Sequence, residues 1–419
     1  MRKMWVLLIA ASFSSVLSAQ SPPVLTLEEC IKRAEQYSYR LQSDEYEISA
    51  AENIASLAKT RALPRIDGEL ATDNLFLKPY YFNQSWAAVH ADWSLGDYLK
   101  KTDRSAVQEI VTRRLIQEQT RLDIIGESTS LYISILQVRK QIEILGHRLR
   151  LLGQHYQLSK GLWKAGIRSQ LDVLQTESEV IRLREDTSRL AVVRENLRSE
   201  LSHLLGWSNT DSLRLMPVEL NSIALMPLPP VFLESLADNP LLASFDSRVK
   251  TQQFRTDELV AEQIPHIKMG SGFFADGDPG GDGGYFQINA GVVVPIFYRH
   301  EPDLKKQHSE AKVHSLESQK KDIERELVIH LIEVHNKMVN LRDLMGLQMK
   351  RQTISAKAVS IAEMNYKAGI SSNLDFISAQ QRLTDIQLAI EETNLEFTMN
   401  LIEYFLSTSQ IENIFTLGK

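Results

Sequence analysis

Two segments with the same pattern decide the fold predicted for this sequence: Lys164-Ala165-Gly166-Ile167 followed by Leu171-Asp172, and Lys367-Ala368-Gly369-Ile370 followed by Leu374-Asp375. The second segment repeats the first at a constant distance along the chain. Each lies between two long stretches with the periodicity of amphipathic helices, which is typical of a turn that joins two helices. Two matching turns indicate an internal duplication, and one of this length predicts an architecture built twice.

The residue types in the two turns suit the end of one helix and the start of the next. Gly166 and Gly369 can take the left-handed conformation without a Cβ clash, so we expect each to end a helix. Ser169 in the first turn and Ser371 in the second can then cap the following helix with their hydroxyl groups.

The N-terminus has the composition of a secretory signal peptide, which we place at residues 1–19. Arg2 and Lys3 precede an apolar run over residues 5–13, and small residues precede a cleavage site before Gln20. The apolar run is too short to cross a bilayer as a helix. We therefore expect an exported protein whose leader is removed.

Composition limits the remaining classes of function. Apolar residues make up 43% and charged residues 24% of the 419 positions, which predicts a folded chain. The net charge of −6 gives no basic surface for nucleic acid. The single cysteine, Cys30, excludes a disulfide within one chain and lies in a helical pattern, where we expect a half-buried thiol rather than a lipid anchor.

The order of patterns predicts two repeats that each run helix, strand pair, long helix, turn, helix. The first repeat covers residues 20–206 and the second covers residues 231–408, with a proline-rich linker over 207–230 and a C-terminal tail over 409–419. We expect the helices at 27–62, 97–164, 170–206, 231–263, 299–366 and 371–408. We expect the strands near 65–76, 85–95, 266–276 and 284–297, each first strand being preceded by a proline, Pro64 or Pro265.

The expected strands alternate between apolar and polar residues, and the alternation keeps the same register in both repeats. After the leader no apolar run is long enough for a membrane helix, so a membrane crossing would need strands. We assign His90 and Asp92 to the side that faces a lumen. The predicted lipid-facing residues are Ala87, Val89, Ala91, Trp93, Leu95, Ile288, Ala290, Val292, Val294 and Ile296.

Four strands are too few to close a membrane barrel, because the smallest barrels have eight. Strand edges cannot stay unpaired in lipid, so the chain is expected to form an oligomer that pools its strands. The long helices carry heptad repeats and would pack side by side as a rod.

The sequence resembles the TolC family of outer-membrane efflux proteins from about Leu27 to Leu406. The resemblance rests on the order and spacing of several short motifs. These are Leu25-Thr26-Leu27-Glu28-Glu29, the two prolines before the strands, Pro295-Ile296-Phe297, Trp163-Lys164-Ala165-Gly166 and Tyr366-Lys367-Ala368-Gly369.

The resemblance implies an α+β fold in which three chains form one channel. Each homotrimer would have a 12-stranded transmembrane β-barrel, with four strands from each protomer, and an α-barrel, a coiled-coil tunnel that projects into the periplasm. It implies a location in the outer membrane of a Gram-negative cell and three kinds of partner: outer-membrane lipid, a periplasmic adaptor (membrane fusion) protein, and an inner-membrane efflux pump or secretion ATPase. The adaptor would dock on the two turns, at Lys164, Ala165, Gly166, Ile167, Lys367, Ala368, Gly369 and Ile370.

The resemblance also implies a periplasmic gate near the second turn, with an acidic ring at Asp375 and a link from Tyr366. The family's second aspartate is Ser378 in this sequence, and its arginine is Ser371. We hypothesise that Arg168 and Asp172, beside the first turn, supply a replacement pair.

The remaining motifs do not predict a catalytic or metal-binding site. The loop over 276–284 is rich in aspartate and glycine, but Gln287 stands where a calcium loop starting at Asp276 needs a glutamate. We therefore expect a surface hairpin there, no metal site, no cofactor and no catalytic constellation. The sequence predicts a passive exit duct for an efflux or type I secretion system. The alternative is a periplasmic coiled-coil scaffold or adaptor that does not conduct.

Overall fold

The computed structural model describes residues 24–60, 63–77, 80–94, 103–207, 213–218, 228–229, 233–261, 266–276, 284–294 and 300–417. The predicted signal peptide, Leu95, Ile296, the motif Pro295-Ile296-Phe297 and most of the loop over 276–284 lie outside these residues.

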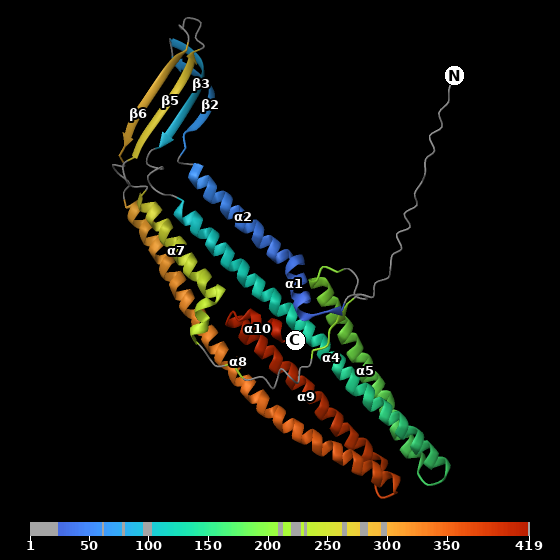
Figure 1. The fold of residues 1–419 in the computed structure, drawn as a ribbon. Helices are drawn as coiled ribbons and strands as arrows, with labels where there is room; N and C mark the ends of the chain where they lie inside the picture. The colour runs from blue at the N-terminus through green and yellow to red at the C-terminus, as the bar shows by residue number, and fades with distance from the viewer. Residues whose placement is uncertain are drawn as a thin grey trace, which may run out of the picture.

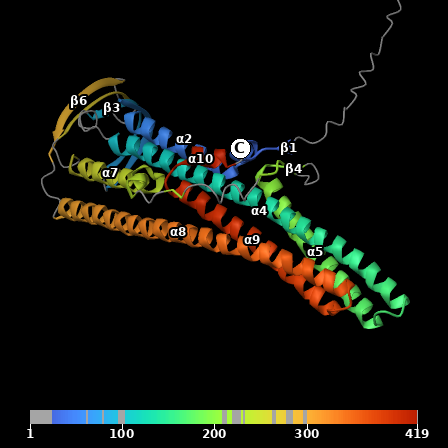
Figure 2. The ribbon, with the colours of Figure 1, turned by 60° about the horizontal axis from the view of Figure 1, so that its bottom comes forward.

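The molecule is a long helical rod with one sheet at its end (Figure 1). The two longest helices, α4 (Arg104–Lys164) and α8 (Glu301–Lys367), have 61 and 67 residues. At about 1.5 Å per residue each is close to 100 Å long. Both turn at the end of the rod farthest from the sheet, and Figure 2 shows the two turns close together.

Shorter helices lie along the two long ones. Helices α2 (Tyr39–Thr60) and α5 (Gln170–Leu204) contact α4, and helices α7 (Pro240–Ala261) and α9 (Asn373–Ser407) contact α8. Helix α9 also contacts α4, which joins the two halves of the rod. A helix of 60 residues needs such a continuous partner surface, because propensity alone does not hold it.

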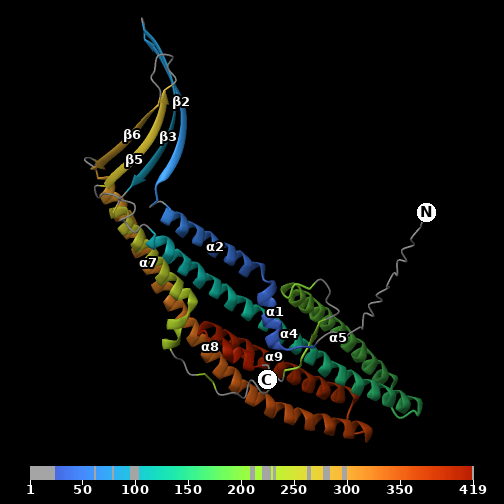
Figure 3. The same cartoon turned by 45° about the horizontal axis from the view of Figure 1, so that its top comes forward.

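The sheet has four antiparallel strands in the order β2-β3-β5-β6. Its strands are β2 (Arg65–Leu77), β3 (Tyr80–Ser94), β5 (His266–Asp276) and β6 (Tyr285–Val293). Figure 3 shows the sheet curving away from the axis of the helices. Strand β3 pairs with β5 along nine residue pairs, so the two hairpins form one surface.

The main core lies near the middle of the rod, where α1 (Leu27–Tyr37), α4, α8, α9 and the short helix α10 (Ile411–Thr416) meet. Tyr132 of α4 is fully buried there, and its hydroxyl lies 2.7 Å from the carbonyl oxygen of Met216 and 3.1 Å from that of Leu25. These contacts join the core to a parallel strand pair, β1 (Val24–Leu25) with β4 (Arg214–Leu215). Among the described helices, no segment is long and apolar enough to span a membrane.

The single helix predicted over 27–62 is wrong, because the structure has α1 and α2 with a break at Ser38. Ser38 has an extended backbone (φ −72°, ψ 115°), and its hydroxyl accepts a hydrogen bond from the amide of Leu41 at 3.3 Å. A serine side chain can compete with a helix for backbone hydrogen bonds in this way. Serine destabilises a helix interior only slightly, so the hydrophobic periodicity of the sequence does not reveal the break.

The single helix predicted over 231–263 is also wrong. A 3-10 helix at Leu233–Asp238 precedes α7, which begins at Pro240. The proline disfavours helical backbone at the residue before it, and the side chain of that residue, Asn239, accepts hydrogen bonds from the amides of Leu241 and Leu242.

Several boundaries differ from the prediction at chain segments with little periodicity. Strand β3 begins at Tyr80 rather than near residue 85. Helix α4 begins at Arg104 rather than at 97. The tail over 409–419 contains α10, whose Ile414 is buried in the main core, and the linker over 207–230 contains β4.

Candidate functional site: the junction of the two turns

The first turn forms a regular helix end followed by a new helix start. Gly166 has φ +71°, and the amide of Ile167 donates to the carbonyl of Leu162 at 2.9 Å, which closes the last turn of α4. Ser169 then caps α5 by accepting from the amide of Asp172 at 3.4 Å. The sequence predicts both features.

The second turn has the same geometry with a different capping residue from the one predicted. Gly369 has φ +80°, and the amide of Ile370 donates to the carbonyl of Asn365 at 2.8 Å. The cap of α9 is Ser372, not Ser371, because Ser372 stands at the position that matches Ser169 in the repeat.

Asp375 completes a capping box with Ser372. Its carboxylate accepts from the Ser372 hydroxyl at 2.7 Å and from the Ser372 amide at 2.9 Å. These hydrogen bonds to Ser372 lower the pKa of Asp375, so the exposed group stays ionised. Asp375 therefore has a helix-capping role in the single chain.

Arg168 joins the two turns directly. Its guanidinium group lies 4.6 Å from the centre of the Tyr366 ring, and it donates hydrogen bonds to the carbonyls of Tyr366 at 2.8 Å and Ser371 at 3.2 Å. The first turn thus supplies a cation that stacks on an aromatic ring and donates to one carbonyl in the last turn of α8 and one in the turn before α9.

Tyr366 is the buried centre of this contact. Its side chain is fully buried, and its hydroxyl lies 3.1 Å from the Ser159 hydroxyl of α4 and 3.4 Å from a carboxylate oxygen of Asp172. Burial raises the pKa of Tyr366, which keeps the phenol protonated and able to donate to Asp172. The geometry brings Arg168, Asp172 and Tyr366 of the proposed gate together and leaves Asp375 apart.

Asn373 forms the second part of the contact, at the start of α9. Its amide donates to the carbonyl of Asp172 at 3.0 Å, and its side-chain oxygen lies 2.7 Å from Nε2 of His155 and 3.3 Å from the hydroxyl of Thr176. His155 is buried, and its ring packs 4.1 Å from that of Phe376 between centroids. We call Arg168, Asp172, Tyr366 and Asn373, with His155, the tip junction.

Burial lowers the pKa of His155, so the imidazole is neutral at neutral pH and its Nε2 donates to Asn373. Sequence analysis missed His155, Ser159 and Asn373. One signal was available: Arg148, His155 and Ser159 are polar residues on the buried seam of α4 that also carries Leu145 and Leu152. Polar residues on a buried seam need partners, which identifies them as members of a hydrogen-bond network.

The residues predicted for adaptor docking lie at the exposed end of the rod. Ile167 and Ile370 are 66% and 77% exposed, and both glycines have open space around them. Exposed apolar side chains on two adjacent turns suit a protein partner, and docking here stays a prediction.

The predicted lipid-facing residues that the structure describes share one face of the sheet by strand alternation. Four aliphatic side chains on this face are more than half exposed in the single chain, namely Val89 58%, Ile288 72%, Val292 65% and Val294 52%, whereas Trp93 is half-buried.

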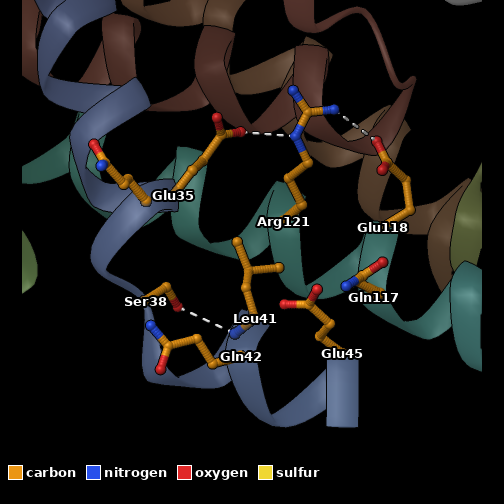
Figure 4. Close-up of a pocket in the computed structure, with 9 residues that line it drawn as sticks. Glu35, Ser38, Leu41, Gln42, Glu45, Gln117, Glu118 and Arg121 are labelled. Atoms are coloured by element: carbon orange, nitrogen blue, oxygen red, sulfur yellow. Dashed lines mark hydrogen bonds and ion pairs between the residues drawn. The ribbon is translucent and has the colours of Figure 1, made fainter. Parts of the chain in front are cut away.

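A separate surface pocket lies at the break between α1 and α2 (Figure 4). Arg121 of α4 points into it and forms ion pairs with Glu35 at 2.7 Å and Glu118 at 3.3 Å. The ion pair between Arg121 and Glu35 attaches the end of α1 to α4. The charged residues of this pocket therefore have a structural role.

Comparison with known proteins agrees with this architecture. Residues 30–206 match the model of the outer membrane efflux protein family. A search of curated proteins gives no match. Among solved structures, the chain is similar to that of CusC, described as changing conformation during folding and transmembrane channel formation, with 15% identity, TM-score 0.82, and coverage of 91% of this chain and 92% of that one.

Two further channels give similar values. The open-state MtrE outer membrane channel of Neisseria gonorrhoeae has 14% identity and TM-score 0.78, with 91% of this chain and 88% of that chain covered. The outer membrane protein VceC of Vibrio cholerae has 14% identity and TM-score 0.73, with 91% and 95% covered. Within its first half the chain thus matches the outer membrane efflux protein family, and over nearly its whole length it has the fold of these solved outer-membrane proteins.

Proposed function

We propose that the protein is the passive exit duct of a tripartite efflux system in a Gram-negative outer membrane. In this role it receives its cargo from an inner-membrane transporter through a periplasmic adaptor. The family match and the fold of solved outer membrane channels support an efflux duct. The choice of partner, including a secretion ATPase in place of an efflux pump, belongs to the proposal.

The observation that carries the proposal is the two-faced sheet. One face presents Val89, Ile288 and Val292, all more than half exposed, and the other presents Asp67, His90 and Asp92. Strands β2 and β6 each have one strand partner among the described residues. An exposed apolar face with two open edges is unstable in water and in lipid unless further strands complete it.

Copies of the same chain are the simplest source of those strands. In a closed ring, β6 of one protomer pairs with β2 of the next, and three protomers would give a 12-stranded barrel whose apolar face meets lipid. The helices of the three copies would then continue the barrel as a tunnel into the periplasm. The two-repeat division at 20–206 and 231–408 is part of the same proposal.

Gating belongs to the tip junction in this proposal. Arg168 holds the α8–α9 turn against the α4–α5 turn within one protomer, while Asp375 of each protomer supplies the acidic ring. Adaptor binding to the exposed residues of the two turns would favour an arrangement in which the turns move apart and the end of the tunnel opens.

Cell fractionation with and without heating tests the proposal. An exit duct should be recovered in outer-membrane extracts, and its electrophoretic band should fall from the mass of three chains to that of one on boiling. A monomer in the soluble periplasm would instead support the scaffold or adaptor. Cross-linking from cysteines placed at Lys164 and Lys367 would then identify the captured adaptor and transporter.

A further inference from the structure

A group of metal-ligand side chains lies on the polar face of the sheet. Asp67 of β2 is directly opposite His90 of β3, and Asp92 follows His90 on the same face. One possible ligand atom from each of the three residues lies within 4.8 Å of the others, and His90 Nε2 is 3.7 Å from a carboxylate oxygen of Asp92.

These separations are close to those of a metal site. Ligands about 2.1 Å from a tetrahedral ion lie roughly 3.4 Å from one another. The pair His90–Asp92 is already near that spacing. The register with His90 fixes the backbone of Asp67 beside the pair, and its carboxylate lies within 4.8 Å of the other two ligand atoms.

Gly270 opens the site toward a fourth oxygen. On β5 it pairs with Asp92 on one side and with Asn289 of β6 on the other. A Cβ atom at Gly270 would lie 3.0 Å from a carboxylate oxygen of Asp92 and nearer still to the side-chain oxygen of Asn289. The two oxygens thus extend over the glycine from opposite sides, and three strands supply one nitrogen and three oxygen ligands.

Charge and access also suit a cation. Two carboxylates face one imidazole. The cation Arg65 lies beside them, with its Nε 2.9 Å from Asp67, and Lys268 lies on the same face of β5 two residues from Gly270. The side chains of Asp67, His90 and Asp92 are 36%, 27% and 65% exposed, so an ion from solution can reach them. Arg65 holds Asp67 in place without using its full acceptor capacity, because a carboxylate has about four acceptor positions.

We propose that Asp67, His90, Asp92 and Asn289 bind a divalent first-row transition-metal ion. Imidazole nitrogen with carboxylate and amide oxygen suits Zn²⁺ or Co²⁺ better than calcium, which takes oxygen ligands only, or copper(I), which prefers sulfur. The site joins β2, β3 and, across Gly270 of β5, Asn289 of β6, near the end of the sheet that leads into the helices. It depends on the sheet of one chain and does not require that the protein conduct.

Metal titration of the purified full chain tests the site, with any polyhistidine tag avoided. We expect one Zn²⁺ per chain by isothermal titration calorimetry, and Co²⁺ should give a visible absorption band that Zn²⁺ abolishes. His90→Gln and Asp92→Asn should each weaken Zn²⁺ binding by at least about tenfold, because each removes a ligand. Ca²⁺ should bind more weakly than Zn²⁺ to the wild type.

Glu69→Gln is the matched control, since Glu69 is an exposed carboxylate on the same face of β2, next along from Asp67. It should leave Zn²⁺ affinity unchanged, and Arg65→Gln should leave it unchanged or raise it. The proposal is overturned if the wild type shows no saturable Zn²⁺ binding, or if His90→Gln and Asp92→Asn, both retaining the wild-type thermal transition, change the affinity by less than twofold.

Discussion

Arg168 connects the two turns of the tip junction through both its charge and its hydrogen bonds. It stacks on Tyr366 and bonds to two carbonyls of the opposite turn, so one guanidinium holds two turns that are far apart in the sequence. The repeat does not preserve this role, because Ser371 occupies the matching position in the second turn. The two turns therefore have the same backbone geometry, but only the first contributes an arginine to the contact between them.

Arg168→Ala should loosen the two turns relative to each other, because the Tyr366 ring loses its cation and the carbonyls of Tyr366 and Ser371 each lose one hydrogen-bond donor. Spin labels on cysteines at the exposed positions Lys164 and Lys367 would report the distance between the turns by double electron–electron resonance, in samples diluted with unlabelled chain. We expect one narrow distance in the parent protein and a longer, broader distribution in the variant.

Arg184→Ala is the control, since Arg184 is exposed on α5, several turns from the tip. It should leave the distribution unchanged. Identical distributions for Arg168→Ala and the parent would show that the tip junction does not hold the turns together.

His155 should make the stability of the tip junction depend on pH. Burial lowers its pKa from 6.5, partly offset by the hydrogen bond to Asn373 and by the nearby charges of Glu363 and Asp172, while Lys367 adds to the lowering. The unfolded chain then takes up a proton near pH 6.5 that the folded chain resists. Stability is full above that pH and falls as pH drops below it, by at most about 1.4 kcal/mol per pH unit.

His155→Gln removes the titrating group and keeps an amide donor for Asn373. Thermal unfolding followed by circular dichroism between pH 7.5 and 5.5 should show a larger fall in the midpoint for the parent than for the variant. The difference isolates His155 from the chain's other histidines. Equal slopes for the two proteins would contradict the assignment.

At the scale of elements, the periodicity of the sequence predicted the strand pairs and long helices, because both patterns reflect which side is buried. It could not locate the break at Ser38 or the end of the 3-10 helix at Asp238, since these depend on local hydrogen bonds that the side chains of Ser38 and Asn239 accept from backbone amides. The metal-ligand group could not be predicted from the sequence either. His90 and Asp92 are close together along the chain, but Asp67 lies beside them only because of the register of β2 with β3.

The tip junction was predicted in part for a similar reason. Tyr366, Asp172 and Arg168 are next to the turns, so their positions along the chain suggested them. His155 lies in α4 and Asn373 in α9, and the sequence does not say which face of one helix meets the other.

The two turn glycines give a prediction at this scale. Gly369→Ala should destabilise the second turn by about 1 kcal/mol, because the Cβ atom of an alanine is too close to the backbone when φ is positive. Gly161→Ala, in the last turns of α4 with open space around the new Cβ, should instead stabilise by up to about 1 kcal/mol. Chemical unfolding of the parent and both variants measures the two changes in the free energy of unfolding. A Gly369→Ala protein as stable as the parent would contradict the left-handed conformation of residue 369.

At the scale of the whole molecule, one chain supplies a four-stranded sheet with an exposed apolar face and a helical rod with exposed apolar side chains, among them Ile332, Leu347 and Ile354 of α8. A ring of identical chains would pair the edges of the sheet at β2 and β6 and bury the apolar side chains of the rod, while the apolar face of the sheet would meet lipid. The proposal of a duct rests on these exposed surfaces together with the channel fold.

Single-channel recording in planar lipid bilayers tests the duct most directly. The purified oligomer should insert and pass ion current without an energy source. Its conductance should be small while the turns are closed and several-fold larger in Arg168→Ala, whereas Asp375→Ala should change ion selectivity through loss of the acidic ring. Absence of any current from a correctly folded oligomer that is recovered with lipid would contradict the account.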